Sequence, residues 1–335
     1  MGIKHLNKFI KTNCSDCLTT ISLEQLKGKE IAIDASIYLY RFISEDCLVE
    51  NIYLMNALFK KYDITPIFIF DGKPPPEKQK ILMERKIKKA EAKVHYDNFK
   101  KQLENITDQS EKHEIDIEMM KLKRKFICIK NEQIRLVKEL LSAMGVYYIE
   151  AEGEADNLCA WLTIKNKVYA CLSEDMDMFV YGCPRILRYF SIYKEKMILY
   201  NTKKILKKLH LTQSEFRELC VLSGSDYNDS VKENTTDNKC YSKEKRKTIF
   251  HYYEMVKNNT NNKSRDYIYD KNETINYNEM IRICDLFDIN KLQQHEIIGN
   301  KKEMVDRKKN NNFKTIPNET RLRQLLNDDG FIFLD

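Results

Sequence analysis

The sequence predicts an α/β fold in which helices flank a mainly parallel central sheet. Four short apolar runs, at residues 30–33, 66–70, 146–149 and 168–172, alternate with stretches of helical periodicity. This alternation favours parallel strands, because the connection between two parallel strands usually contains a helix. Acidic side chains follow every run, and the crevice of a parallel sheet lies beyond the carboxyl ends of its strands. The sequence therefore predicts one acidic site at that edge of the sheet.

The acids occur where each predicted strand ends. The first strand ends in Asp34 and the second in Asp71. The third leads into an acidic cluster at the start of a helix, where the helix dipole favours negative charge, and two aspartates follow the fourth. These later acids are Glu152, Glu154, Asp156, Asp175 and Asp177. An acidic helix cap with a polar loop would explain one such group alone, but the recurrence after every strand favours a shared site.

Carboxylates that crowd together need a positive partner, because like charges a few Å apart raise one another's pKa. Mg²⁺ suits them, since it takes oxygen ligands and is usually shared with a substrate phosphate. Two such ions about 3.5 to 4 Å apart would hold the attacking and leaving oxygens of a phosphodiester. No histidine accompanies the acids, which disfavours zinc. We therefore expect two Mg²⁺ ions as cofactor, with Mn²⁺ as a substitute.

Charge and cysteine content narrow the class of protein. The 335 residues carry 57 Lys and Arg against 50 Asp and Glu, a formal net charge of +7. If many acids gather at one site, the remaining surface is distinctly basic, which suits nucleic acid as a partner. The 10 cysteines have no regular spacing and are typical of reduced thiols in an intracellular protein. We find no signal peptide and no membrane-spanning apolar run, so we expect no membrane partner.

A basic helix is expected after the second strand. Prolines at 74–76 delay its start, and a long charged stretch runs from Glu77 to about residue 104. Its cations fall within about 80° of one another around a helix, as one basic stripe that could hold a phosphate strand over the metals. The stripe consists of Lys78, Arg85, Lys89, Lys93 and Lys100. A solvated helix face is the alternative. Residues 104–125 are expected to form a mobile lid.

The remaining elements follow from periodicity and capping signals. Leu6, Phe9 and Ile10 mark an amphipathic lead, and the ring of Tyr40 could stack on a base or fill the core. Residues 258–272 favour a flexible segment, and Asp226 lies in a turn that contains glycine. Helices are expected at 35–42, 53–61, 115–125, 131–144, 202–209, 216–222, 244–257, 277–287 and 317–326, and further strands at 178–181, 186–190 and 197–200.

Six sequence blocks occur in a fixed order between residues 1 and 227. They are Met1-Gly2-Ile3, the run from Ile31 to Ser36, Phe70 to Pro75, Gly153 to Asp156, Glu174 to Asp177, and Leu222 to Tyr227. Together they resemble the flap endonuclease family, which includes nucleases of the xeroderma pigmentosum group G and exonuclease 1 types. The resemblance implies a PIN-like 5′ nuclease fold with a helical arch, at about residues 75–104, and a helical C-terminal region.

The resemblance also implies roles for particular residues. Lys78 and Arg85 would be catalytic cations, and Asp177 would be both a metal ligand and a catalytic residue. The implied metal ligands are Asp34, Asp71, Glu154, Asp156, Asp175, Asp177 and Asp226. The candidates for DNA contact are Gly2, Tyr40, Lys73, Lys89 and Lys93, with Tyr40 stacked on the nucleotide beside the scissile bond. Glu152 stays outside the matched acids, as a surface or supporting residue.

The expected function follows from these roles. We expect a Mg²⁺-dependent 5′ flap endonuclease and 5′–3′ exonuclease that acts on branched or flapped DNA in replication, repair or recombination. The alternatives are an RNA endonuclease on the same fold and an inactive scaffold that only binds nucleic acid. A scaffold has no reason to keep all seven acids and both cations. We expect a monomer, located in the nucleus or at a cytoplasmic viral replication site.

The C-terminal part departs from the family. Family members have a helix-hairpin-helix there, whose Gly-x-Gly hairpin binds K⁺ and duplex, but residues 228–243 contain no glycine. We therefore expect neither that hairpin nor its K⁺ site, and Gln324 lacks the neighbours of a sliding-clamp motif. The Asn/Lys/Ile-rich composition fits a viral-type member. The expected regions are a nuclease region at 1–104, a cap or linker at 105–130, a second nuclease region at 131–227 and a divergent DNA-binding region at 228–335.

Overall fold

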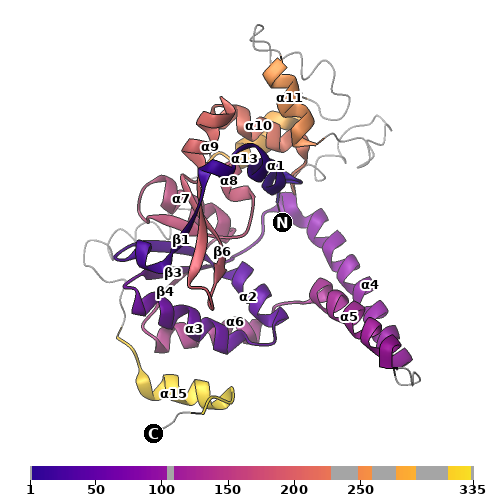
Figure 1. Cartoon of the computed structure of the whole chain (residues 1–335), viewed down its shortest axis with the longest axis vertical. Helices are drawn as coiled ribbons and strands as arrows, with labels where there is room; N and C mark the ends of the chain where they lie inside the picture. Colours follow the sequence, from indigo (N-terminus) through magenta and orange to yellow (C-terminus); the bar gives the residue numbers. More distant parts are fainter. Residues whose placement is uncertain (1, 104–108, 228–247, 259–276, 292–315, 333–335) are drawn as a thin grey trace.

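One mixed sheet forms the centre of the fold. The computed structural model describes residues 2–103, 109–227, 248–258, 277–291 and 316–332 (Figure 1). Within these residues, seven strands pair in the order β1-β7-β6-β5-β2-β3-β4. The strands are β1 (Leu18–Ser22), β2 (Glu30–Asp34), β3 (Thr65–Phe70), β4 (Tyr147–Glu150), β5 (Ala170–Leu172), β6 (Arg185–Ser191) and β7 (Lys196–Asn201).

The sheet is mainly parallel, as predicted. Five neighbouring strands, β4, β3, β2, β5 and β6, pair in parallel with one another in that order. In the described part of the chain, both antiparallel pairs involve β7, which lies between β6 and β1. The carboxyl ends of the five parallel strands therefore lie at the same edge of the sheet.

Helices cover both faces of the sheet, so that its strands are buried on both sides. Successive residues of a strand point to opposite faces. In β2, Ile31 and Ile33 belong to one hydrophobic core and Ala32 to the other, and all three are fully buried. The apolar runs that predicted the strands are therefore the residues that the two helical layers cover.

The two layers contain different parts of the chain (Figure 1). The core that includes Ala32 packs against α1 (Leu6–Asn13), α7 (Ala155–Ile164), α8 (Asp177–Tyr181), α9 (Thr202–Leu209), α10 (Gln213–Ser223), α11 (Ile249–Asn258) and α13 (Tyr277–Leu286). The other core packs against α2 (Ala35–Ser44), α3 (Leu48–Lys61), α6 (Asn131–Ala143) and α15 (Glu319–Asp328). Thr212 and Glu215 form a capping box at the start of α10, with both of its hydrogen bonds.

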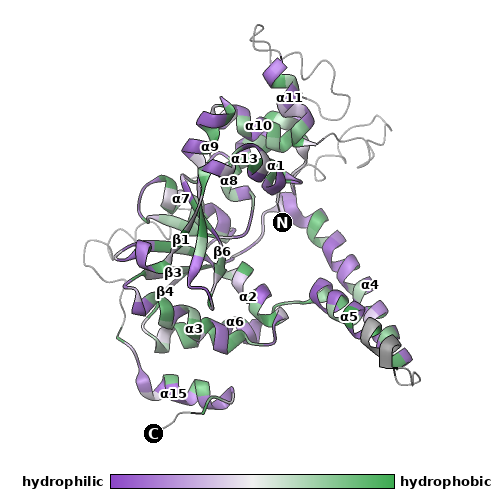
Figure 2. Ribbon diagram, in the orientation of Figure 1, coloured by the Kyte–Doolittle hydropathy of each residue, from purple (hydrophilic) through white to green (hydrophobic). Residues whose placement is uncertain are grey.

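Two long helices project from the body as a pair (Figure 1). They are α4 (Gln79–Leu103) and α5 (Gln109–Phe126). Ala92 is buried in α4, and the ring centres of Tyr96 and Phe126 lie 5.2 Å apart across the pair. Much of both helices is hydrophilic (Figure 2). The helix predicted after the prolines is confirmed, and the helix predicted in the lid is longer than expected.

Two predictions of local structure are wrong. Residues 178–181, predicted as a strand, form most of the helix α8, because a short apolar run does not distinguish a buried helix from a strand. Gly182 ends this helix with φ 92°. Strand β1 was missed, since residues 18–22 alternate weakly and lie at the edge of the sheet. Most of the predicted flexible segment (259–272), the glycine-free 228–243 stretch and the start of the 244–257 helix lie outside the described residues.

None of the helices in the described ranges combines the length and the apolar character needed to cross a membrane.

The last helix of the described residues, α15, packs beside α6. The N–H of Asn318 donates to the carbonyl oxygen of Ala143 at 2.8 Å, and the rings of Tyr53 and Phe331 lie 5.7 Å apart. The closing helix predicted from residue 317 onward is therefore confirmed as part of the core.

Candidate active site

Seven acids meet beyond the carboxyl ends of the parallel strands. Each of them interacts electrostatically with at least one other member of the set. They are Asp34 at the end of β2, Asp71 after β3, Glu154 and Asp156 at the start of α7, Asp175 after β5, Asp177 at the start of α8 and Asp226 after α10. The structure thus brings together the complete set of predicted metal ligands. Glu152 has an exposed side chain, as predicted for a residue outside this set.

Burial makes several of these acids unlike surface carboxylates. Asp34 is 4% exposed and Asp177 is 1% exposed. Burial is the main cause that raises the pKa of Asp34 to about 7, and Asp71 and Asp175 add to it. Burial, followed by neighbouring aspartates, also raises the pKa of Asp156 and of Asp177 well above the usual range. Without a cation, the cluster therefore holds protons near neutral pH.

The raised pKa of Asp34 predicts how stability depends on pH in the metal-free protein. Between pH 3.8 and about 7, the folded state keeps a proton that the unfolded state releases. The free energy of unfolding therefore falls as the pH rises through this window, by up to ~1.4 kcal/mol per pH unit. We expect the Tm in EDTA to fall between about pH 5 and pH 7. Asp34→Asn should show a smaller slope, and an unchanged slope would contradict the assignment.

Hydrogen bonds hold the first two acids in place. The Ser36 hydroxyl donates to Oδ2 of Asp71 at 2.5 Å, and the N–H of Ala155 donates to Oδ1 of Asp71 at 2.8 Å. The Ser173 hydroxyl donates to Oδ2 of Asp34 at 3.1 Å. Sequence reasoning did not assign the two serines to the site. The signal for Ser36 was its place in the block that begins at Ile31.

Two predicted cations reach the acids. Nζ of Lys78 lies 2.7 Å from Oε1 of Glu154, and Nη2 of Arg85 lies 2.5 Å from Oδ2 of Asp226. Lys78 is itself 6% exposed. Burial lowers the pKa of Lys78, but Tyr227, Glu154 and two aspartates of the cluster together raise it more, so the ammonium stays charged. The site therefore combines crowded carboxylates with two positive groups at their border.

Tyr227 contacts both Lys78 and Glu154, although sequence reasoning did not predict it as a site residue. Its hydroxyl donates to Oε2 of Glu154 at 3.0 Å, and its ring centre lies 4.9 Å from Nζ of Lys78. An ammonium over an aromatic face is attracted by the ring. The signal that could have identified Tyr227 is its position directly after Asp226, in the last of the six blocks.

Gly2, a predicted DNA contact, lies against the acids. Its φ is +76°, in the left-handed region that favours glycine. A Cβ at this position would lie 2.3 Å from Oδ1 of Asp177 and 2.4 Å from Oδ1 of Asp175. These distances leave no room for a side chain. The start of the chain therefore forms part of the wall of the site.

Gly72 joins the exit of β3 to the segment that precedes α7. Its N–H donates to the carbonyl oxygen of Gly153 at 2.7 Å, and the N–H of Lys73 donates to the carbonyl oxygen of Glu152 at 3.1 Å. A Cβ at residue 72 would lie 2.0 Å from the carbonyl oxygen of Ala151. These contacts hold the end of β3, next to Asp71, against the segment that leads to Glu154 and Asp156.

Gly72→Ala is expected to lower the Tm and the activity together. The new methyl group would meet backbone, which cannot yield as a side chain does, and overpacking of this kind costs about 1–3 kcal/mol. Gly153→Ala is the matched control, because a Cβ there meets nothing within 4 Å. Thermal unfolding of the two variants checks the prediction. Equal Tm values for both would contradict it.

A basic cavity lies between α4, the end of α5 and Tyr40, and its volume is about 680 Å³. Nζ of Lys89 lies 4.9 Å from the centre of the Tyr40 ring and 3.4 Å from its hydroxyl. The other cations that line the cavity are Arg85, Lys86, Lys93, Arg124 and Lys125. The structure thus groups three of the predicted DNA contacts, whereas Lys73 is exposed and lies outside the cavity lining.

The prediction of one basic stripe needs correction. Lys78 lies in the short 3-10 turn η3 (Pro76–Lys78) and not in α4, because the preceding prolines delay the helix. Its ammonium contacts Glu154 among the acids and does not line the cavity with the other cations. Arg85, Lys89 and Lys93 line the cavity, but Lys100, near the far end of α4, does not. The predicted stripe is therefore divided between a buried catalytic candidate and a cavity wall.

The donor set fits a hard divalent cation in its chemistry. All seven groups offer oxygen, and Oδ1 of Asp177 is buried without a hydrogen-bond partner among the described residues. Across the same residues, no three His, Cys, Asp or Glu side chains are grouped tightly enough to hold an ion as they stand. Lys78 and Arg85 already balance two of the acids.

Comparison with known proteins agrees with this fold and site. Two family models match the chain, the XPG N-terminal domain at residues 1–92 and the XPG I-region at residues 145–226. Flap endonuclease 1 of Zea mays is 32% identical over 251 residues, which cover 69% of this chain and 63% of the relative. Flap endonuclease 1 of Drosophila mojavensis is 35% identical over 251 residues, with 69% and 62% coverage.

Solved structures share the architecture. The catalytic core of Rad2 in complex with a DNA substrate has a TM-score of 0.56 at 22% identity, covering 96% of this chain and 93% of that one. Flap endonuclease-1 from Methanococcus jannaschii has a TM-score of 0.53 at 23% identity, covering 92% and 94%. These likenesses define the class as a PIN-like α/β fold of the 5′ nuclease type.

Within that class, the chain belongs to the XPG and flap endonuclease family. Its two matched regions contain all seven acids together with Lys78 and Arg85. The matched part spans about 63% of the length of the curated relatives. The viral-type character predicted from composition stays a prediction.

Proposed function

We propose that the chain is a Mg²⁺-dependent, structure-specific 5′ nuclease that hydrolyses DNA phosphodiesters at 5′ flaps. One observation carries this proposal: seven acids from separate elements meet at the carboxyl edge of the sheet, bordered by Lys78 and Arg85. The names of its relatives, which are flap endonucleases, support the choice of flapped DNA among possible substrates.

The proposed mechanism assigns separate tasks to the acids and the cations. When bound to the acids, two divalent ions would supply an activated water and stabilise the charge of the leaving oxygen. Lys78 and Arg85 would exchange their carboxylate partners for oxygens of the scissile phosphate, whose negative charge grows during the reaction. Lys78 stays charged, so it would stabilise charge without moving a proton.

The cavity cations would hold the single strand beside the site. Lys89 and Lys93 lie on the same helix as Arg85, so a backbone held along α4 would lead toward the acids. Tyr40 would stack on a base, since its ring lines the same cavity. Gly2 would allow the reacting nucleotide to approach closely, because no side chain intervenes. Lys73, exposed on the loop after β3, would meet the phosphate backbone outside the cavity.

We propose that the chain is divided into nuclease, cap and DNA-binding regions. Residues 1–104 and 131–227 would form the nuclease, residues 105–130 the cap and residues 228–335 a divergent DNA-binding region. We propose a monomer that acts on branched or flapped DNA in replication, repair or recombination inside the cell, with neither a K⁺ site nor a sliding-clamp motif.

A substrate comparison tests this function. The full chain is incubated with Mg²⁺ and 5′-labelled substrates of matched sequence: a double-flap DNA, a blunt duplex, a single strand and an RNA flap. A single cut near the DNA flap junction is the expected result. Preference for the RNA flap would instead favour an RNA endonuclease, and binding of all substrates without any cut would favour an inactive scaffold.

A further inference from the structure

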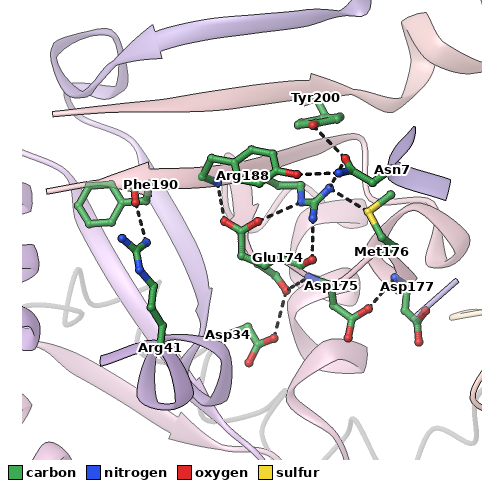
Figure 3. A network of polar contacts seen from close by, with 12 residues as sticks. Asn7, Asp34, Arg41, Glu174, Asp175, Met176, Asp177, Arg188, Phe190 and Tyr200 are labelled. Carbon is green, nitrogen blue, oxygen red and sulfur yellow. Dashed lines mark hydrogen bonds and ion pairs between the residues drawn. The ribbon is translucent and has the colours of Figure 1, made fainter. Parts of the chain in front are cut away.

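Arg188 on β6 holds the loop that carries Asp175 and Asp177 (Figure 3). Its Nη2 donates to the carbonyl oxygen of Glu174 at 2.8 Å, and its Nε lies 3.4 Å from Oε2 of the same residue. Its Nη1 lies 2.8 Å from the sulfur of Met176, to which it donates. The guanidinium therefore contacts the residues on both sides of Asp175, which place the two aspartates.

Asn7 holds the other side of the guanidinium (Figure 3). Its Oδ1 accepts from Nη1 of Arg188 at 3.0 Å, and its Nδ2 donates to the Tyr189 hydroxyl at 2.8 Å. The carboxylate of Glu174 accepts from the N–H of Tyr189 at 2.5 Å. One polar cluster thus joins α1, β6 and the loop after β5, which are far apart in the sequence.

Burial makes this cluster sensitive to substitution. Arg188 is 4% exposed, and a guanidinium stays charged in proteins, so its burial is favourable only with a charged partner and satisfied hydrogen bonds. Glu174 supplies the charge. Its ion pair reaches the buried Nε, which has no hydrogen-bond partner among the described residues. None of the contacts of Arg188 described above is with one of the seven acids, so its influence on them acts through the loop.

Hydrogen bonds connect this loop to three of the acids. The N–H of Asp177 donates to Oδ1 of Asp175 at 3.1 Å, and the N–H of Asp175 donates to Oγ of Ser173 at 3.1 Å. The Ser173 hydroxyl in turn donates to Asp34 at 3.1 Å. A shift of residues 174–176 would therefore change the spacing of these carboxylates and release the bond to Asp34.

We propose that Arg188, paired with Glu174, is a positioning residue that sets the spacing of Asp175 and Asp177 for divalent cations. This inference rests on the proposed function, because it takes the acids as metal ligands. Loss of Arg188 should weaken metal binding without weakening DNA binding, since the cations proposed to contact DNA lie on α4, on α5 and on the loop after β3, away from the contacts of Arg188 described above.

Mn²⁺ binding to the full chain, followed by electron paramagnetic resonance, tests this role. Arg188→Met removes the charge and the forked donors, and we expect Mn²⁺ affinity to fall by roughly 10- to 100-fold, as for other residues that orient metal ligands. Flap binding in EDTA should stay at the wild-type level. Arg185→Met is the matched control, because Arg185 lies on the same strand and donates to the carbonyl oxygen of Tyr169 at 2.5 Å. It should bind Mn²⁺ as the wild type does.

Arg188→Lys covers the case in which Arg188→Met does not fold. Lysine keeps the charge but cannot hold the carbonyl, the carboxylate and the sulfur in one fork. We expect Arg188→Lys to lose Mn²⁺ affinity too, but less than Arg188→Met does. Wild-type Mn²⁺ affinity in a folded Arg188 variant would overturn the positioning role. If the wild-type chain itself binds no Mn²⁺, the proposed function fails instead, which separates the two outcomes.

Discussion

Replacing Asp177 with asparagine is expected to slow cleavage of a 5′-flap DNA by roughly 10³-fold, while binding of the DNA changes little. Asp177 is 1% exposed, and its carboxylate borders the position of Gly2. Asparagine keeps the shape of the side chain but loses the charge that a hard cation prefers. Oδ1 of Asp177 has no hydrogen-bond partner in the described part of the chain. The substitution therefore removes mainly the negative charge and breaks no hydrogen bond at this atom.

The same variant should not be less stable than the wild type in EDTA. Burial and the neighbouring Asp175 raise the pKa of Asp177, which means that its charged form is disfavoured in the folded state. Asparagine removes that cost. Single-turnover rates and Tm values measured on the same preparation check both expectations. Asp16→Asn is the control, because Asp16 pairs with Lys208 on the surface. Wild-type turnover in Asp177→Asn would contradict its assignment.

Lys78→Met is expected to slow cleavage by roughly 10²-fold and to destabilise the metal-free protein. The ammonium of Lys78 is buried against Glu154 at 2.7 Å. Removing Lys78 leaves the half-buried Glu154 carboxylate without its cation, and loss of one partner of a buried ion pair costs about 3–5 kcal/mol. Mg²⁺ should restore part of the stability, because it supplies positive charge to the same acids, but it should not restore the rate.

Rates and Tm values measured with and without Mg²⁺ check this second prediction. Lys88→Met is the matched control, since Lys88 is exposed on α4 and lies outside the lining of the cavity. It should have a wild-type rate and Tm. If Lys78→Met cleaves as fast as Lys88→Met does, Lys78 does not stabilise the reacting phosphate.

The acidic edge of the sheet could be predicted from the sequence because two local signals coincide there. The apolar runs are covered by helices on both faces, so they stand out along the chain. Parallel pairing then places the strand ends at one edge, whatever the order of the strands. Asp34 and Asp71 needed no more than this argument. The position of Asp226 came only from the resemblance, since it follows a helix.

Contacts between distant segments could not be predicted in this way. Arg188 and Asn7 are 181 positions apart, and no periodicity connects them. Tyr227 contacts Lys78 through the fold of the whole site. The error at residues 178–181 has a local cause, because four buried apolar residues satisfy a strand and a helix equally. Lys78 lies outside the helix, because the prolines at 74–76 delay the start of α4 beyond it.

The most direct test of the account is the metal dependence and the position of the cut. A 5′-labelled double-flap DNA is incubated with the full chain in EDTA, and Mg²⁺ is then added, with Asp177→Asn in parallel. We predict no cleavage in EDTA, one product cut near the flap junction after Mg²⁺ is added, and almost none from the variant. Cleavage that proceeds in EDTA, or an identical product from Asp177→Asn at the wild-type rate, would contradict a metal-dependent nuclease site at the acidic edge of the sheet.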